Sequence, residues 1–251
     1  MRMRRKKWAR PELAVCPYFI KDPSRHRGEW AAQFERKAPI HLELGCGKGT
    51  FAARLAADHP EINYMAIDIK SDILAVARRN VQQVFAQTGR PVDNLKLMAY
   101  EIQLIHTLMA PEDTVDRIYI NFCNPWPRTA HHKKRLTHPK QLVLYATFLR
   151  DGGEIHFKTD DDELFRDSQE YLTQLGFDLR YITYDLHESG WQGSPSTEHE
   201  EMFSAQGIKT KFLVAVYRKD YTDRRIAEML RSFPKYAPPQ VPDGVFRPEI
   251  V

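Results

Sequence analysis

The chain has 251 residues, enough for one well-buried α/β domain with small additions. Its hydrophobic share of 42% and charged share of 28% are ordinary for a globular protein and exclude wholesale disorder. No apolar run approaches the length that spans a bilayer. The three cysteines, Cys16, Cys46 and Cys123, are too scattered for a disulfide framework or a zinc site, so we expect a reducing, cytoplasmic location.

Positive charge is concentrated rather than spread over the chain. The net charge is only +4, yet basic residues gather at the N-terminus: Arg2, Arg4, Arg5, Lys6, Lys7 and Arg10. The apolar segment that follows is short, contains Pro17 and lacks a cleavage pattern, so it does not indicate a signal peptide. Local basic clusters on a nearly balanced protein favour contact with a polyanion.

Strands and helices are expected to alternate from Ile40 onward, after a basic arm of 38 residues without a clean period. The strands are expected at residues 40–44, 64–68, 95–101, 117–121, 154–158, 177–186 and 211–217. Helices are expected after Gly49, across residues 73–85, and at 139–150, 163–175, 198–205 and 222–231. This order predicts an α/β, Rossmann-like fold with a mostly parallel seven-stranded sheet and helices on both faces. We divide the chain into an arm (1–38), a main domain (39–217) and an extension (218–251).

A glycine loop follows the first expected strand. Gly45, Gly47 and Gly49 come directly after Glu43 and open a helix, where a ligand can approach the backbone. The dinucleotide fingerprint needs its third glycine at position 50, which is Thr. The loop therefore favours S-adenosylmethionine over NAD.

Acidic residues support this interpretation, because glycines after a strand often serve packing alone. Asp68 ends the second expected strand, where a ribose would be bound, and Glu101 ends the third, near the adenine. Glu43 would face the methionine end of the cofactor. Together they favour a cofactor site over a purely structural loop.

A turn of polar, proline and aromatic residues follows the fourth expected strand, in the segment Asn124-Pro-Trp-Pro127. Such a turn keeps the backbone out of a helix, so polar groups can meet a base edge beside an aromatic wall. The alternative interpretation, which the pattern favours less, is that Trp126 only packs under the turn. A basic run comes next, Arg128, His131, His132, Lys133, Lys134 and Arg135, and the two histidines lack partners with metal-ligand spacing, so no metal is expected.

Two acidic segments complete the pattern. Asp160, Asp161 and Asp162 precede a helix, where at least one acid is expected to be a cap and Asp160 is the best functional candidate. Residues 197–200, Thr-Glu-His-Glu, also have the spacing of a capping box.

Taken together, the chain resembles the bacterial tRNA (guanine-N7)-methyltransferase family from about Met1 to Tyr217. The matching segments, in order, are 1–8, 43–49, 121–127, 131–137, 155–160 and 197–207. The resemblance implies S-adenosylmethionine as cofactor and a guanine in the variable loop of tRNA as substrate. It implies cofactor contacts at Glu43, Asp68, Glu101 and Asn124, and substrate contacts at Arg128, Asp160, Thr197, Glu198, His199 and Glu200.

The sequence departs from the family at two informative positions. The family usually has Asp before Pro-Trp, where this chain has Asn124, and usually Lys at the position of Arg128. Guanine N7 carries a lone pair and no proton, so its attack on a methyl group needs alignment rather than a general base. Asn124 can still position the base, and we expect an active enzyme in which Asn124 and Asp160 orient the guanine.

The expected partner is tRNA, gripped along its backbone by Lys133, Lys134 and Arg135, and the protein is expected to be a monomer or homodimer without a membrane contact. Two alternatives stay open. An Asn-Pro-aromatic turn also suits methylation of an exocyclic base amine, and loss of the usual Asp suits a non-catalytic RNA-binding relative.

Overall fold

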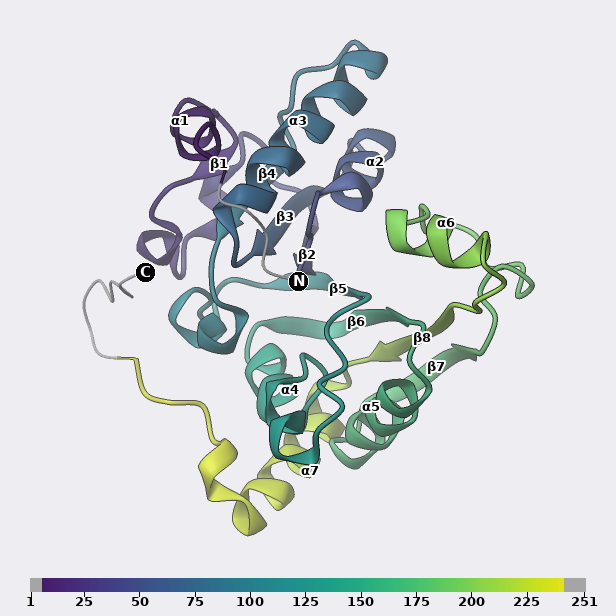
Figure 1. The fold of residues 1–251 in the computed structure, drawn as a ribbon. Coiled ribbons are helices and arrows are strands. Elements are labelled where there is room, and N and C mark those ends of the chain that lie inside the picture. The colour runs from purple at the N-terminus through teal and green to yellow at the C-terminus, as the bar shows by residue number, and fades with distance from the viewer. Residues whose placement is uncertain (1–5, 242–251) are drawn as a thin grey trace.

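The computed structural model describes residues 6–241, and Figure 1 shows a central sheet between two groups of helices. The predicted basic residues Arg2, Arg4 and Arg5 lie outside the described residues, as does the end of the predicted extension, residues 242–251.

The sheet has eight strands among the described residues, one more than the sequence predicts. Their spatial order is β1-β4-β3-β2-β5-β6-β8-β7. The additional strand is β1, a two-residue edge strand that is too short to give a pattern in the sequence. The bounds are β1 Phe19–Ile20, β2 Ile40–Leu44, β3 Asn63–Asp68, β4 Leu95–Ala99, β5 Val115–Asn121, β6 Leu149–Thr159, β7 Asp178–Thr183 and β8 Lys211–Val216.

The pairing is parallel from β1 to β6, and β8 pairs antiparallel with both β6 and β7. The predicted mostly parallel, Rossmann-like sheet is thereby confirmed. Because β2, β3, β4, β5 and β6 run the same way, the loops after them gather at one edge, where a ligand site is expected.

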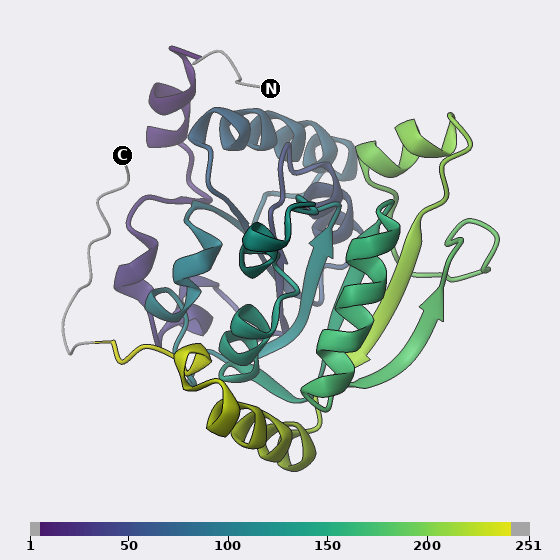
Figure 2. The ribbon, with the colours of Figure 1, turned by 60° about the horizontal axis from the view of Figure 1, so that its bottom comes forward.

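Helices cover both faces of the sheet, as predicted (Figure 1). On one side lie α1 Ala9–Ala14, α2 Thr50–Asp58 and α3 Ser71–Thr88, and on the other α4 Pro139–Ala146, α5 Asp162–Gln174 and α7 Lys219–Ser232. The short helix α6 Glu198–Ser204 lies beside α2, and Figure 2 shows it at the far end of the domain from α7. Across the described residues, five 3-10 helices complete the elements: Pro23–His26, Trp30–Gln33, Ile102–Thr107, Thr129–Lys134 and Pro234–Tyr236.

Helix α4 is shorter than predicted. It ends at Ala146 rather than near Arg150, because Leu149 pairs with Val115 and already belongs to β6. Glycines at positions 152 and 153 interrupt the apolar pattern of this long strand, which explains why the sequence indicates only its second half.

The first 38 residues contribute to the core. Trp30 is fully buried, and Asp113 accepts hydrogen bonds from the backbone N–H of Gly28 and of Trp30, at 2.6 and 3.0 Å. The indole N–H of Trp30 donates to the Leu108 carbonyl at 2.9 Å. The predicted division into arm, main domain and extension stays a prediction.

Within residues 6–241, no helix combines the length and the apolar character needed to cross a membrane.

Candidate active site

The glycine loop is fastened to the end of β3. The backbone N–H groups of Gly45 and Cys46 both donate to the Ile67 carbonyl at 2.9 Å. The N–H of Gly47 donates to Asp68 Oδ2 at 3.0 Å. The loop after β2 and the acid that ends β3 therefore form one unit, as the sequence predicts for a Rossmann-like ligand site.

Gly49 lets this loop pack directly on α3. Its φ of 68° lies in the left-handed region, and a Cβ added there would stand 2.7 Å from the Cβ of Ala77. Both the conformation and the close approach require glycine. The loop and α2 then form one wall of a cavity of about 450 Å³, whose lining residues are Glu43, Gly45, Cys46, Gly47, Lys48, Gly49, Thr50, Phe51, Ile73, Asn121, Phe122, Thr197, Glu198, His199 and Met202.

Glu43 lines this cavity and is almost completely buried. Asn121 Nδ2 donates to its Oε1 at 3.1 Å, and the Tyr64 hydroxyl donates to its Oε2 at 3.3 Å. Burial raises the pKa of Glu43 to about 7, although these two hydrogen bonds act in the opposite direction. A cation bound in the cavity would favour the ionised carboxylate, so the site suits a ligand that carries positive charge.

Asp68 and Glu101 lie at successive positions along the sheet edge but do not line this cavity. Asp68 is engaged with the glycine loop and with the Lys70 N–H at 3.0 Å. Strand β4 ends at Ala99, two residues before the predicted end, and Glu101 is exposed just beyond it.

The turn after β5, residues 122–127 and called the base-side turn from here on, has an unusual backbone. Phe122 and Trp126 have φ values of 50° and 45°, the left-handed region that non-glycine residues rarely adopt. Asn124 Oδ1 accepts a hydrogen bond from the Trp126 N–H at 3.0 Å, which closes a small side-chain turn. Strain of this kind clusters at functional sites because the surrounding structure must hold it.

The basic run after the turn divides into two kinds of residue. Arg128, Lys133 and Lys134 are exposed, and Lys134 Nζ lies 4.8 Å from the centre of the Trp126 ring. Arg135 is different, because its side chain is completely buried and pairs with carboxylates of α5. The prediction that Arg135 grips the RNA backbone is wrong for this conformation, since a buried and neutralised guanidinium cannot reach a phosphate.

The three aspartates after β6 separate as the sequence suggests. Asp161 caps α5 through a 2.7 Å bond from the Leu164 N–H, and Asp162 pairs with Lys211 at 2.8 Å. Lys211 Nζ also donates to the Asp160 carbonyl at 2.9 Å, and within residues 6–241 the Asp160 carboxylate makes no hydrogen bond. Asp160 is therefore the acid of the three that is available to a ligand.

The predicted capping box at the start of α6 is confirmed. The Glu200 N–H donates to the Thr197 side chain at 3.0 Å, and the Thr197 N–H donates to Glu200 Oε2 at 3.3 Å. Glu200 is also buried against Lys158, with Nζ and Oε2 2.9 Å apart. The ion pair anchors α6 to β6 and the cap stabilises the first turn of α6, so Glu200 has a structural role beside any contact with substrate.

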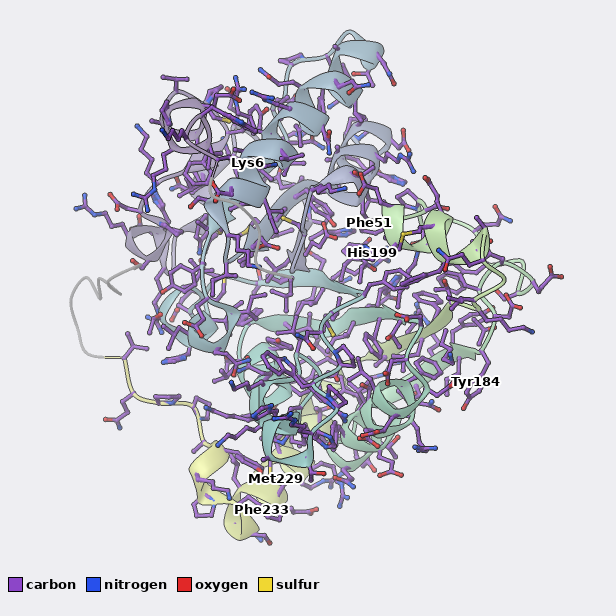
Figure 3. The ribbon with its side chains drawn as sticks, viewed as in Figure 1. Lys6, Phe51, Tyr184, His199, Met229 and Phe233 are labelled. Carbon is purple, nitrogen blue, oxygen red and sulfur yellow. The ribbon has the colours of Figure 1, made fainter. Side chains whose placement is uncertain are left out.

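Helix α6 closes over the glycine loop. Glu198 pairs with Lys48 at 2.8 Å, and the His199 ring stacks on Phe122 with centroids 5.8 Å apart. Figure 3 shows Phe51 and His199 on the facing elements α2 and α6, and both line the cavity. This Lys48–Glu198 ion pair is exposed and contributes little, on the order of 0–1 kcal/mol. The helix is held mainly by the stacking, the capping box and the buried contact between Lys158 and Glu200.

The structure brings Glu43, the three glycines, Thr197, Glu198 and His199 to one cavity, and sets Asn124 and Asp160 just beyond the ends of the adjacent strands β5 and β6. Sequence reasoning missed Asn121, Phe122 and Phe51 as lining residues. Asn121 could have been found from the sequence, because it ends the strand next to that of Glu43 and the carboxyl ends of parallel strands meet.

The comparisons with known proteins agree with this geometry. Residues 37–213 match the family model described as "Putative methyltransferase". A tRNA (guanine-N(7)-)-methyltransferase of Clostridium perfringens (strain SM101 / Type A) is 57% identical over 216 residues, which cover 86% of this chain and 99% of the relative. The chain belongs to the tRNA (guanine-N7)-methyltransferase family.

A relative of the same name from Ruminiclostridium cellulolyticum is 52% identical over 220 residues, covering 87% of this chain and 93% of its own. Family membership makes the protein a methyltransferase whose methyl donor is S-adenosylmethionine, as the glycine loop predicts.

Solved structures support the fold. A structure titled "Structure of an Antibiotic Related Methyltransferase" has a TM-score of 0.53 at 15% identity, over 79% of this chain and 98% of its own. The 16S rRNA methyltransferase KamB has a TM-score of 0.52 at 14% identity, over 74% and 90%. At these identities the likeness concerns the Rossmann-like methyltransferase fold alone.

Proposed function

We propose that this chain methylates N7 of a guanine in the variable loop of tRNA, at position 46. The observation that carries the proposal is the high identity to relatives named for this reaction, matched over nearly their whole length. The cavity at the glycine loop, next to a strained aromatic turn with exposed cations, is consistent with it.

S-adenosylmethionine supplies the methyl group on a positively charged sulfur. We assign its binding to Glu43, the backbone of Gly45, Gly47 and Gly49, Asp68, Glu101 and Asn124. The buried Glu43 supports this assignment, because a carboxylate with a pKa of about 7 gains most from a nearby positive charge. Gly49 supports it as well, since the absent Cβ lets the loop that lines the cavity pack close to α3.

The reaction asks little proton chemistry of the protein. The in-plane lone pair of N7 attacks directly, so the chain must hold the guanine about 3–3.5 Å from the methyl carbon and in line with the departing sulfur. We assign this orientation to Asn124 and Asp160, whose strands are neighbours in register. The Asp160 carboxylate can also stabilise the positive charge that develops on the methylated ring.

The RNA is expected to contact the exposed cations Arg128, Lys133 and Lys134, together with Thr197, Glu198 and His199 at the cavity and Glu200 in the first turn of α6. Target bases in RNA are recognised most readily in loops, where they can be unstacked. Phe122 and His199, which stack on each other, supply aromatic surface in the cavity, and Trp126 supplies another in the turn that follows β5. We further propose a cytoplasmic protein that acts as a monomer or homodimer, with Cys16, Cys46 and Cys123 as free thiols.

A radiolabelled methyl-transfer assay on bulk unmodified tRNA tests the proposal. Nuclease digestion and mass spectrometry of the product are expected to give N7-methylguanosine. Recovery of N6-methyladenosine would instead indicate an exocyclic amine as target. Absence of both transfer and S-adenosylmethionine binding, measured by calorimetry, would indicate a non-catalytic RNA-binding relative.

A further inference from the structure

Arg135 connects the base-side turn to helix α5. Its Nε donates to the Pro125 carbonyl at 2.6 Å, and Nη2 lies 2.9 Å from Glu163 Oε1. Its Nη1 donates to Asp167, and Nη2 contacts His132 Nε2 at 2.9 Å. The guanidinium is thus completely buried, faces two carboxylates, and directs one N–H at the turn.

The contact with Pro125 matters because of which peptide it holds. The Pro125 carbonyl and the Trp126 N–H belong to a single peptide unit. Asn124 Oδ1 accepts from the N–H at 3.0 Å, and Arg135 donates to the carbonyl at 2.6 Å. Both ends of this peptide are therefore fixed, next to a Trp126 backbone whose left-handed φ of 45° costs about 1–3 kcal/mol.

We propose that Arg135 is a positioning residue for methyl transfer, which fixes the 125–126 peptide and through it the orientation of Asn124 and Trp126. The inference rests on the proposed function. Glu163 and Asp167 anchor the guanidinium, so the position of the turn depends on α5. Arg135 acts on the reaction through the turn and not through the RNA backbone.

The same contacts leave no room for a metal at this cluster. His132, Glu163 and Asp167 lie close enough together to hold an ion, but the Arg135 guanidinium already contacts all three. The cation that these ligands need is supplied by the chain itself.

Arg135→Lys separates positioning from phosphate binding. A lysine ammonium is a point charge and cannot span the Pro125 carbonyl, Glu163 and Asp167 with a planar fork. A phosphate contact, in contrast, tolerates the exchange well. Positioning therefore predicts that Arg135→Lys lowers kcat by about 10- to 100-fold, the range expected for a reacting group displaced by about 1 Å.

Two binding measurements accompany the rates. The KM for tRNA and the slope of log Kd against log salt are expected to stay at their wild-type values, and calorimetry is expected to give an unchanged affinity for S-adenosylmethionine. The matched control is Arg166→Lys, an exposed arginine on α5, the helix that carries Glu163 and Asp167, with wild-type kcat expected. Unchanged kcat in Arg135→Lys would overturn the inference. So would a salt slope lowered by about one in Arg135→Gln, which is the mark of a lost phosphate contact.

Two further measurements test the inference even if Arg135→Lys does not fold or the protein shows no methyl transfer. Asp167→Asn removes one anchor while the guanidinium stays, and a smaller fall in kcat with an unchanged salt slope is expected even if Arg135→Lys fails to fold. Hydrogen exchange at the Trp126 amide needs no methyl transfer, and it is expected to speed up by about tenfold in Asp167→Asn. Methylation absent from the wild-type protein would refute the proposed function alone, whereas unchanged exchange at Trp126 would refute the role of Arg135.

Discussion

Replacing Glu43 by a glutamine tests the electrostatics of the cavity. Burial raises the pKa of Glu43 from its ordinary 4.5 to about 7 in the folded protein. The folded chain therefore keeps a proton that the unfolded chain releases between these values. The protonated Glu43 stabilises the folded state fully below pH 4.5, and this stabilisation is lost as the pH rises through 7.

The two pKa values set the size of the effect. Between about pH 5.5 and about pH 8.5, this one group lowers the free energy of unfolding by about 2 kcal/mol. A glutamine side chain cannot ionise, so the Glu43→Gln variant does not lose this stability at high pH. Over that interval its free energy of unfolding is expected to fall by about 2 kcal/mol less than that of the wild type. Urea unfolding of both proteins at the two pH values measures the difference.

Glu43→Gln is also expected to change the affinity for S-adenosylmethionine, and here the ionised carboxylate is favourable rather than unfavourable. The wild-type affinity for S-adenosylmethionine is expected to rise as the pH passes through about 7, because the ionised carboxylate attracts a positively charged ligand. In Glu43→Gln the affinity is expected to be weaker and flat with pH. Parallel stability profiles for the two proteins would refute the reasoning about the pKa, and parallel affinity profiles would refute the role in binding.

Three further substitutions test other parts of the site. Gly49→Ala is expected to cost about 1–3 kcal/mol in urea unfolding because its Cβ meets α3, and more than Gly47→Ala, whose Cβ meets nothing within 4 Å. Lys158→Met is expected to cost about 3–5 kcal/mol by leaving the buried Glu200 carboxylate without its lysine, and adding Glu200→Gln should recover most of this loss in the same assay. Asn124→Asp is expected to raise turnover of an already active parent by stabilising the cationic product. An inactive parent with an active Asp variant would contradict that view.

Strands β2, β3 and β5 were predictable because each is a short, largely buried run that ends at a polar residue or is followed by glycine. Residues 40–44 were predicted with the bounds they have in the structure. The edge strand β1 was not predictable, since two residues carry no periodicity and their partner lies in β4, far along the chain.

Individual site residues divide in the same way. The Asp161 cap and the Thr197 capping box follow local rules over three or four residues. The capping box was predicted, as was a cap among the three aspartates 160–162, although the sequence did not say which one. Arg135 was misassigned because its neighbours in sequence are exposed cations. The residues that bury it, Glu163 and Asp167, come 28 and 32 positions later. No local pattern distinguishes a buried guanidinium from a solvated one.

The bonds between Asp113 and the segment around Trp30 also have a consequence for the order of folding. Gly28 and Trp30 leave the ribosome before Asp113, the acceptor of their hydrogen bonds, which follows them by 85 and 83 residues. Contacts of such long sequence separation form slowly, because the intervening chain must first be brought together. During synthesis the Trp30 indole therefore stays exposed until the strands that bury it have been made.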